Sequence, residues 1–187
     1  ADAEVICEGS VYVGFYIRNS RIRATQVIVE SGRGQIVGGL IDADVRVESA
    51  DIGNRMENRT IINIRGFNRE LMKFEMDGLL SVIQAKKKQL SEMKEMLKSF
   101  NKDAQKSKSK AKKIQQEIFH LQEEIKRLES QCLNISNYLK TPGEGAVIVK
   151  NYIYPMVRIT IQNEIFEVLK KDFGPTYILR NGKIETL

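Results

Sequence analysis

Few side chains in this sequence could act as a nucleophile, a base or a metal ligand. The chain has one histidine, His120, and two cysteines, Cys7 and Cys132, which lie far apart along its 187 residues. A catalytic site needs such groups held together in a pocket, and neither cysteine has a base nearby in sequence. His120 is predicted to lie on the outer face of a helix, in solvent. We therefore predict that the protein is not an enzyme and binds no cofactor.

The cysteines, acidic residues and glycines also lack the spacing of a metal or nucleotide site. Cys132 is predicted to pack between helices and Cys7 to lie in a strand, and without a His/Cys cluster they predict neither a disulfide framework nor a zinc site. Gly32-Arg33-Gly34 is only a near miss to a dinucleotide fingerprint, because a strand is predicted to follow it. Four acidic residues could hold a cation, although a solvated face is favoured: Asp42, Asp44, Glu48 and Asp51. A reducing, cytoplasmic setting fits this pattern.

Electrostatic binding is the one chemistry that the sequence indicates directly. Residues 101–113 hold six lysines against one acidic residue, Asp103. The lysines are Lys102, Lys106, Lys108, Lys110, Lys112 and Lys113. The stretch has no aromatic residue for base stacking and no arginine for bidentate base contacts, so sequence-specific nucleic-acid binding is disfavoured. A solvated turn is favoured for this stretch, and the alternative is a salt-sensitive contact with a partner or an anionic surface.

The elements that must position these residues follow from charge, glycine and proline usage. Residues 69–140 contain 16 Lys and Arg against 10 Asp and Glu, whereas the rest of the chain has 14 of each. The same segment has one glycine, Gly78, and no proline, so helix breakers are excluded from it. We predict a discontinuous β domain, 1–68 plus 141–187, with an inserted helical arm at 69–140. No apolar run approaches the roughly 20 residues of a membrane-spanning helix.

The arm is predicted to be an antiparallel coiled-coil hairpin. Apolar residues recur at alternating spacings of four and three in two runs, as in a heptad seam. The first run is Met72, Met76, Leu79, Ile83, Lys86, Leu90, Met93 and Leu97, and the second is Ile114, Ile118, Leu121, Ile125, Leu128, Cys132, Ile135 and Leu139. Antiparallel pairing places Met72 opposite Leu139 and Lys86 opposite Ile125. A parallel homodimer of separate helices is the alternative, and the hairpin is favoured because the polar stretch between the runs permits a turn.

The flanking segments are predicted to be rungs of one β-solenoid. Short β-branched runs begin at Val5, Val27, Val45 and Val147, with glycine-rich corners between the first three. Recurrence near 20 residues is typical of stacked coils of parallel strand. A β-sandwich shares the short strands, but it does not explain why a similar motif returns after the arm. The similarity predicts that Val5 is equivalent to Val147 and Ile17 to Ile159.

These motifs together resemble the bacterial flagellar assembly protein A family. The resemblance is carried by Gly34-Gln35-Ile36-Val37-Gly38-Gly39-Leu40-Ile41-Asp42-Ala43, by the helical pair after Gly66-Phe67-Asn68, and by Gly145-Ala146-Val147-Ile148-Val149 with Ile153-Tyr154-Pro155. It implies a right-handed parallel β-helix with a projecting coiled coil. It also implies a link to flagellar assembly. Members usually carry a further N-terminal domain, which we expect this chain to lack. Residues 54–60 depart from the pattern, being polar and irregular.

Three functions follow as hypotheses. The first is a non-enzymatic scaffold in the cytoplasm whose arm binds protein partners of unknown identity, linked to flagellar assembly or its regulation. The second is a binder of nucleic acid or another anionic surface through the lysines of the arm. The third is a polymerising solenoid of the bactofilin type, ranked last because such a solenoid would not be expected to carry a long inserted arm. The sequence leaves a homo-oligomer open.

Overall fold

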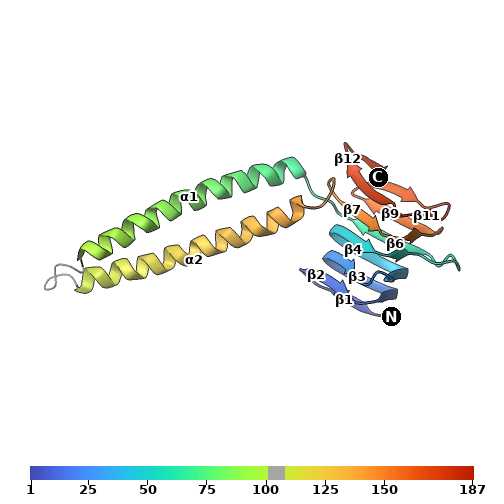
Figure 1. Cartoon of the computed structure of the whole chain (residues 1–187), viewed down its shortest axis with the longest axis horizontal. Helices are drawn as coiled ribbons and strands as arrows, with labels where there is room; N and C mark the ends of the chain where they lie inside the picture. Colours follow the sequence, from blue (N-terminus) through green and yellow to red (C-terminus); the bar gives the residue numbers. More distant parts are fainter. Residues whose placement is uncertain (101–107) are drawn as a thin grey trace. The chain divides into compact units, whose positions relative to one another are not determined.

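The chain folds into two compact units (Figure 1). The computed structural model describes the backbone of residues 1–100 and 108–187, and the side chains of residues 1–99 and 111–187. One unit comprises Ala1–Arg69 and Lys140–Leu187 and contains the strands, and the other comprises Glu70–Leu139. The predicted fold class, a β-solenoid carrying a helical hairpin, is confirmed.

The solenoid is built from strands on both sides of the insertion. Before it lie β1 (Glu4–Ile6), β2 (Ser10–Val13), β3 (Tyr16–Val29), β4 (Gln35–Ser49), β5 (Asp51–Ile52) and β6 (Thr60–Ile64). After it lie β7 (Ala146–Val149), β8 (Tyr152–Ile153), β9 (Val157–Ile161), β10 (Glu164–Glu167), β11 (Asp172–Phe173), β12 (Thr176–Arg180) and β13 (Lys183–Thr186). The pairings among β1 to β9 are parallel, as the stacked turns of a solenoid require.

The core lies inside the coil, where residues one turn apart stack in columns. The columns are Val5, Ile22, Ile41, Ile62 and Ile159; Val11, Val27, Val47 and Val147; and Ile17, Ile36, Ile52 and Ile153. Most of these side chains are fully buried. Stiff β-branched side chains suit such a pleated, enclosed surface. Each fully buried one contributes about 1.5–3 kcal/mol relative to an exposed position.

The predicted equivalence of the short β-branched runs is partly wrong. Val27, Val47 and Val147 do share a column, but the residue stacked on Val27 from the first turn is Val11. Val5 belongs to the column of Ile22, and Ile17 does not share a column with Ile159. The reason is that successive turns differ in length, so residues with similar neighbours in sequence fall at different corners of the coil.

The chain resumes the same stack after the insertion. Val47 pairs with Val147, and Ile62 pairs with Ile159, so β7 and β9 lie directly beside strands that precede the helices. The junction is held within the solenoid unit, where the Arg69 guanidinium donates hydrogen bonds to the carbonyl oxygens of Gly143 and Thr141. The insertion therefore leaves the β ladder continuous.

The C-terminal end of the stack differs from the predicted all-parallel arrangement. β10, β11, β12 and β13 each pair antiparallel to a neighbour. Between β12 and β13 the chain reverses at Asn181 and Gly182, which both have positive φ, as a type I′ hairpin turn requires. A reversing hairpin cannot continue a parallel coil, so these strands cap the solenoid.

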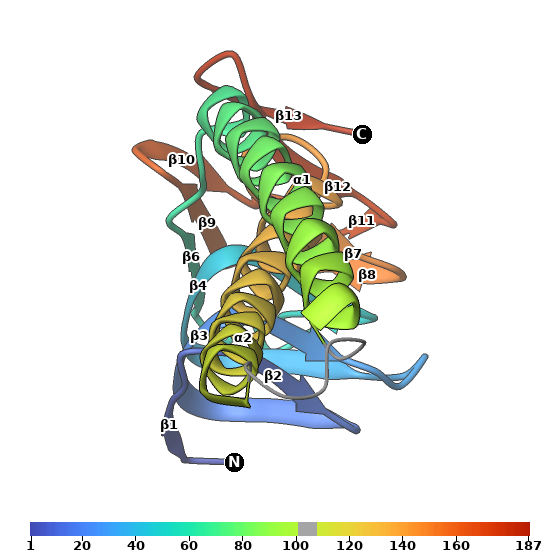
Figure 2. The same cartoon turned by 90° about the vertical axis from the view of Figure 1, so that its left-hand side faces the viewer.

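The second unit is a pair of long helices, α1 (Arg69–Phe100) and α2 (Lys108–Leu139), that run side by side (Figure 1, Figure 2). The eight residues predicted for the α1 seam are buried or half-buried, and so are the eight predicted for α2. Most other described side chains of the two helices are exposed. The burial thus follows the heptad prediction, and α1 and α2 pack as a hairpin within one chain.

Lys86 behaves as a seam lysine should. Its side chain is 25% exposed, and Nζ lies 2.8 Å from a carboxylate oxygen of Glu124 on the opposite helix. The stem packs in the apolar layer while the ammonium leaves it. A second cross-helix pair joins Lys87 and Glu129 at 2.7 Å. Both contacts lie close to the predicted antiparallel pairing of Lys86 with Ile125.

Candidate functional site

The lysine run is only partly within the described residues. Lys102 and Lys106 lie outside them, and Lys108 and Lys110 are placed on α2 without described side chains. Lys112 and Lys113 are exposed on α2. An electrostatic contact at the end of the arm therefore stays a prediction.

The outer surface of the arm carries exposed apolar side chains that the heptad prediction did not single out. They are Leu71, Phe74, Leu80, Val82, Met96, Phe119 and Leu133. Phe74 is 79% exposed and Phe119 61%. These side chains lie outside the seam, and single exposed apolar side chains are common on protein surfaces. No helix in the described part of the chain is long and apolar enough to span a membrane.

His120 is exposed on α2, as predicted, and its ring lies edge-on to Phe119, with ring centroids 6.1 Å apart. It borders a shallow hollow of about 320 Å³ with Lys86 and Glu124. Lys86 and Glu124 form an ion pair across the seam, and Glu117 also lines the hollow. The hollow is therefore part of the ordinary outer surface of the paired helices.

The two cysteines are free thiols in different surroundings. Cys132 is half-buried in the seam, as predicted. Cys7 was predicted to be a strand residue, but it follows the end of β1 and is exposed. Its sulfur accepts a hydrogen bond from the Gly9 amide at 3.2 Å. Cys7 thus lies just past the end of β1, and its amide still donates to the Arg23 carbonyl of β3 at 2.9 Å.

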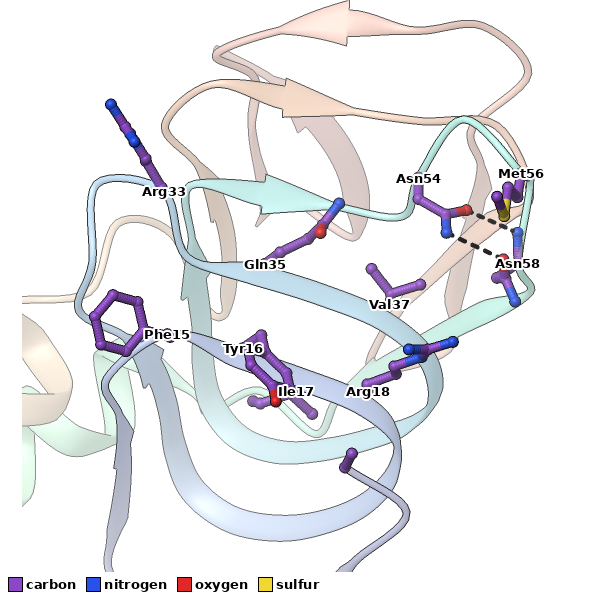
Figure 3. Close-up of a pocket in the computed structure, with 11 residues that line it drawn as sticks. Phe15, Tyr16, Ile17, Arg18, Arg33, Gln35, Val37, Asn54, Met56 and Asn58 are labelled. Atoms are coloured by element: carbon purple, nitrogen blue, oxygen red, sulfur yellow. Dashed lines mark hydrogen bonds between the residues drawn. The ribbon is translucent and has the colours of Figure 1, made fainter.

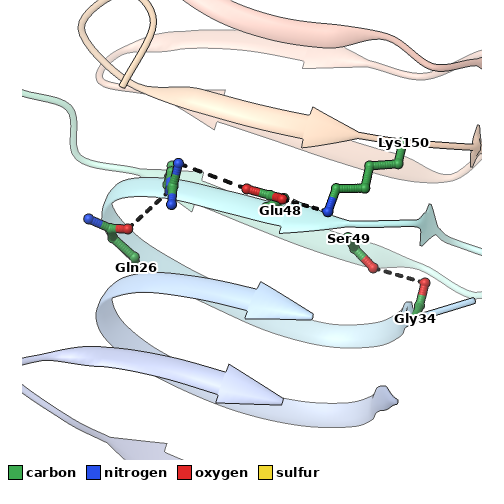
Figure 4. Close-up of polar contacts among 6 residues, drawn as sticks. Gln26, Gly34, Glu48, Ser49 and Lys150 are labelled. Carbon is green, nitrogen blue, oxygen red and sulfur yellow. Dashed lines mark hydrogen bonds and ion pairs between the residues drawn. The ribbon is translucent and has the colours of Figure 1, made fainter. Parts of the chain in front are cut away.

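The acidic stretch of the solenoid is used in contacts between its turns. Glu48 lies 2.8 Å from the Lys150 ammonium and 3.9 Å from the Arg46 guanidinium, which in turn donates to Gln26 (Figure 4). Asp44 pairs with Arg65 at 3.0 Å. Within the residues that the structure describes, no three His, Cys, Asp or Glu side chains are placed to hold a metal ion. These carboxylates tie neighbouring rungs together.

The surroundings of Tyr177 alter the proton affinity of its hydroxyl. Its side chain is buried against Phe166, with ring centroids 4.8 Å apart. Burial, with a smaller contribution from the negative charge of Asp172, raises the pKa of its hydroxyl to about 12. The hydroxyl stays protonated near neutral pH, so Tyr177 is a packing residue of the solenoid core and is not suited to acid–base chemistry.

A groove of about 540 Å³ lies on the solenoid, where the beginnings of β3 and β4 meet the loop between β5 and β6 (Figure 3). Tyr16, Arg18 and Phe15 come from one turn, and Arg33 and Gln35 from the next. Asn54, Met56 and Asn58 close the third side. This size is within the range of pockets that bind small molecules or short peptide segments.

The groove was not predicted from the sequence. It forms because Tyr16 pairs with Gln35, which brings two segments separated by a full turn to the same edge. The polar, irregular residues 54–60, which depart from the family pattern, form much of its far wall. The departure of residues 54–60 from the family pattern was the one sequence signal for the groove. The residues on the opposite wall could not be identified, because their position depends on how the solenoid turns pair.

Comparison with known proteins supports the architecture. The family model described as the flagellar assembly protein A β-solenoid domain matches residues 1–184. No curated protein and no solved structure shows a significant match. The matched span includes the coils, the helical insertion and most of the antiparallel cap. The chain therefore belongs to the flagellar assembly protein A β-solenoid family.

Proposed function

We propose that this protein is a non-enzymatic scaffold in the cytoplasm that acts in bacterial flagellar assembly or its regulation, with the arm as a docking device for protein partners. The observation that carries the proposal is the exposure of Phe74 and Phe119 on helices whose seam is already closed. The family to which the chain belongs supplies the flagellar link.

The surroundings of these side chains support docking. The seam residues account for the association of α1 with α2, so the hairpin gains little from an aromatic ring in solvent. Aromatic residues are enriched among the side chains that dominate protein–protein binding energy. A partner that covers Phe74 or Phe119 would remove this apolar area from water.

The test compares two variants of the full chain as baits in lysate of a flagellated bacterium. Phe74→Ser/Phe119→Ser removes both exposed rings, and Gln84→Ser/Gln131→Ser changes exposed polar residues of the same two helices. We expect flagellar components among the proteins captured by the unaltered chain and by the glutamine variant. They should be lost with the phenylalanine variant, provided its helical circular dichroism is unchanged. Equal capture by both variants would contradict docking through these rings.

A second candidate is contact with an anionic surface through the lysines of the arm. It is favoured by Lys112 and Lys113, which are exposed on consecutive positions of α2. Such a contact would be sequence-independent and would weaken steeply with salt. A salt titration of binding to an acidic protein distinguishes it from docking through the aromatic rings, which depends little on ionic strength.

A further inference from the structure

The groove on the solenoid presents two cations that no carboxylate of the described chain neutralises. The side chains of Arg18 and Arg33 are exposed, and neither takes part in an ion pair among the described residues. The groove lining contains no Asp or Glu. Elsewhere on the solenoid, Arg46, Arg65 and Arg180 have acidic partners, whereas the exposed Arg23 has none among the described residues. The groove therefore attracts an anionic ligand.

The two arginines are separated by an apolar and aromatic surface. Figure 3 shows Arg33 and Phe15 at one side of the groove, Arg18 with Asn58 at the other, and Tyr16 between them. An extended ligand with anionic groups at both ends and an apolar group between them matches this arrangement.

The walls of the groove are fixed before any ligand arrives. Ile17, which lines the groove, and Ile36, next to Gln35, belong to the buried core and are 3% and 0% exposed. Gln35 donates to the Gly53 carbonyl at 2.9 Å, and Asn54 donates to Asn58 at 3.1 Å. A preformed surface loses little conformational entropy on binding.

The Arg33, Gly34 and Gln35 amides at the rim already donate hydrogen bonds within the chain, so they do not form a backbone nest for a phosphate group. A phosphate cradle is usually a nest of free backbone N–H groups. Here the Arg33 and Gly34 amides donate to Ser31, and the Gln35 amide donates to the Phe15 carbonyl. The side chains of Arg18 and Arg33 are left as the cationic donors, and their forked guanidinium groups pair bidentately with carboxylates.

We propose that this groove binds an extended acidic segment of a partner protein, with carboxylates on Arg18 and Arg33 and an apolar side chain against Tyr16. The inference deepens the proposed scaffold function and rests on it, because it names the chemistry of one partner segment. The groove lies in the solenoid unit, so peptide binding to it can be tested separately from partner binding by the arm.

The test uses the full chain and a fluorescein-labelled peptide, Glu-Glu-Leu-Tyr-Glu-Glu, with binding followed by fluorescence anisotropy. Arg18→Gln/Arg33→Gln should weaken binding at least about tenfold, the loss expected for charge-assisted hydrogen bonds. Arg23→Gln/Arg127→Gln removes the same charge from exposed positions outside the groove and should change binding less than about twofold. The peptide Gln-Gln-Leu-Tyr-Gln-Gln should not bind measurably.

Two results would overturn the inference. One is equal weakening by the two arginine pairs, and the other is displacement of the peptide by an oligodeoxythymidine as readily as by unlabelled peptide, since both indicate unspecific attraction of polyanions. Phe74→Ser/Phe119→Ser should bind the peptide like the unaltered chain. A failure of the groove is thereby distinguished from a failure of the arm to capture partners.

Discussion

The solenoid and the arm bury their apolar side chains in different ways. In the solenoid, residues such as Ile41 and Ile62 are 0% exposed and are stacked between neighbours from turns far away in sequence. In the arm, seam residues such as Leu90 and Met93 are only half-buried, and each helix meets one partner. The solenoid therefore depends on long-range register, whereas the arm depends on a local heptad pattern.

The largest expected difference is in the cost of removing a core side chain. Ile41→Ala should lower the free energy of unfolding of the solenoid by about 4 kcal/mol, because stacked strands on both sides cannot close the cavity. Ile125→Ala in the arm should cost about 2 kcal/mol, since the flexible stem of Lys86 lies opposite and can fill the space. Urea unfolding followed at a β and a helical wavelength measures both. Equal costs would contradict the comparison.

The two units also respond oppositely to an added methyl group on glycine. Gly39 has φ of 82°, and a Cβ there would lie 2.2 Å from the Ser20 carbonyl oxygen of the adjacent turn. Gly39→Ala should therefore destabilise the solenoid by about 3 kcal/mol. Gly78 in α1 has open space around it, and Gly78→Ala should stabilise the arm by about 0.5–1 kcal/mol. Thermal melts that shift in the same direction would refute this contrast.

Alkaline pH should weaken the solenoid selectively. The unfolded Tyr177 hydroxyl ionises near pH 10, whereas in the folded solenoid its pKa is raised to about 12. Its stabilising contribution is complete below pH 10 and is lost as the pH rises through 12, a change of about 3 kcal/mol. Urea midpoints of the β signal across this range measure the change. Tyr177→Phe should flatten the dependence, and an unchanged slope in that variant would exclude Tyr177 as the cause.

The smallest effect is expected at the lysine run. Substitution of Lys106, Lys108, Lys110 and Lys112 by Ser should leave the melting temperature nearly unchanged, because surface charges contribute little to stability. Any binding to an acidic protein at low salt should weaken strongly. A large melting shift would show that the run packs against the folded chain.

The same contrast explains how much could be predicted from the sequence. The seam could be predicted residue by residue, including Lys86, because four-and-three spacing is a local property of a helix. For the solenoid, the sequence predicts that β-branched residues stack in columns. It does not predict which residues share a column, because the solenoid turns have unequal lengths. Val11 and not Val5 stacks on Val27 for this reason. A local motif cannot report which residue of the preceding turn lies beside it.

The groove could not be predicted for the same physical reason. Arg18 and Arg33 are unremarkable in sequence, and they line one groove only because Tyr16 pairs with Gln35 across a turn. The antiparallel cap had a readable signal in Asn181-Gly182, a sequence that favours a type I′ turn between two strands. That signal lies in a short C-terminal segment. There the prediction that parallel solenoid turns continue to the end of the chain was preferred to a hairpin.

The central claim is that the solenoid is one folding unit into which the arm is inserted. At the junction, Nε of the Arg69 side chain lies 3.1 Å from the Gly143 carbonyl oxygen, so the two ends of the insertion are close together. We therefore expect that a short linker can replace residues 70–139 without straining the solenoid. The most direct test is circular dichroism of that linker variant during thermal unfolding. We predict a cooperative β transition close to that of the full chain. Loss of the cooperative transition would show that the solenoid needs the arm to fold and would contradict the claim.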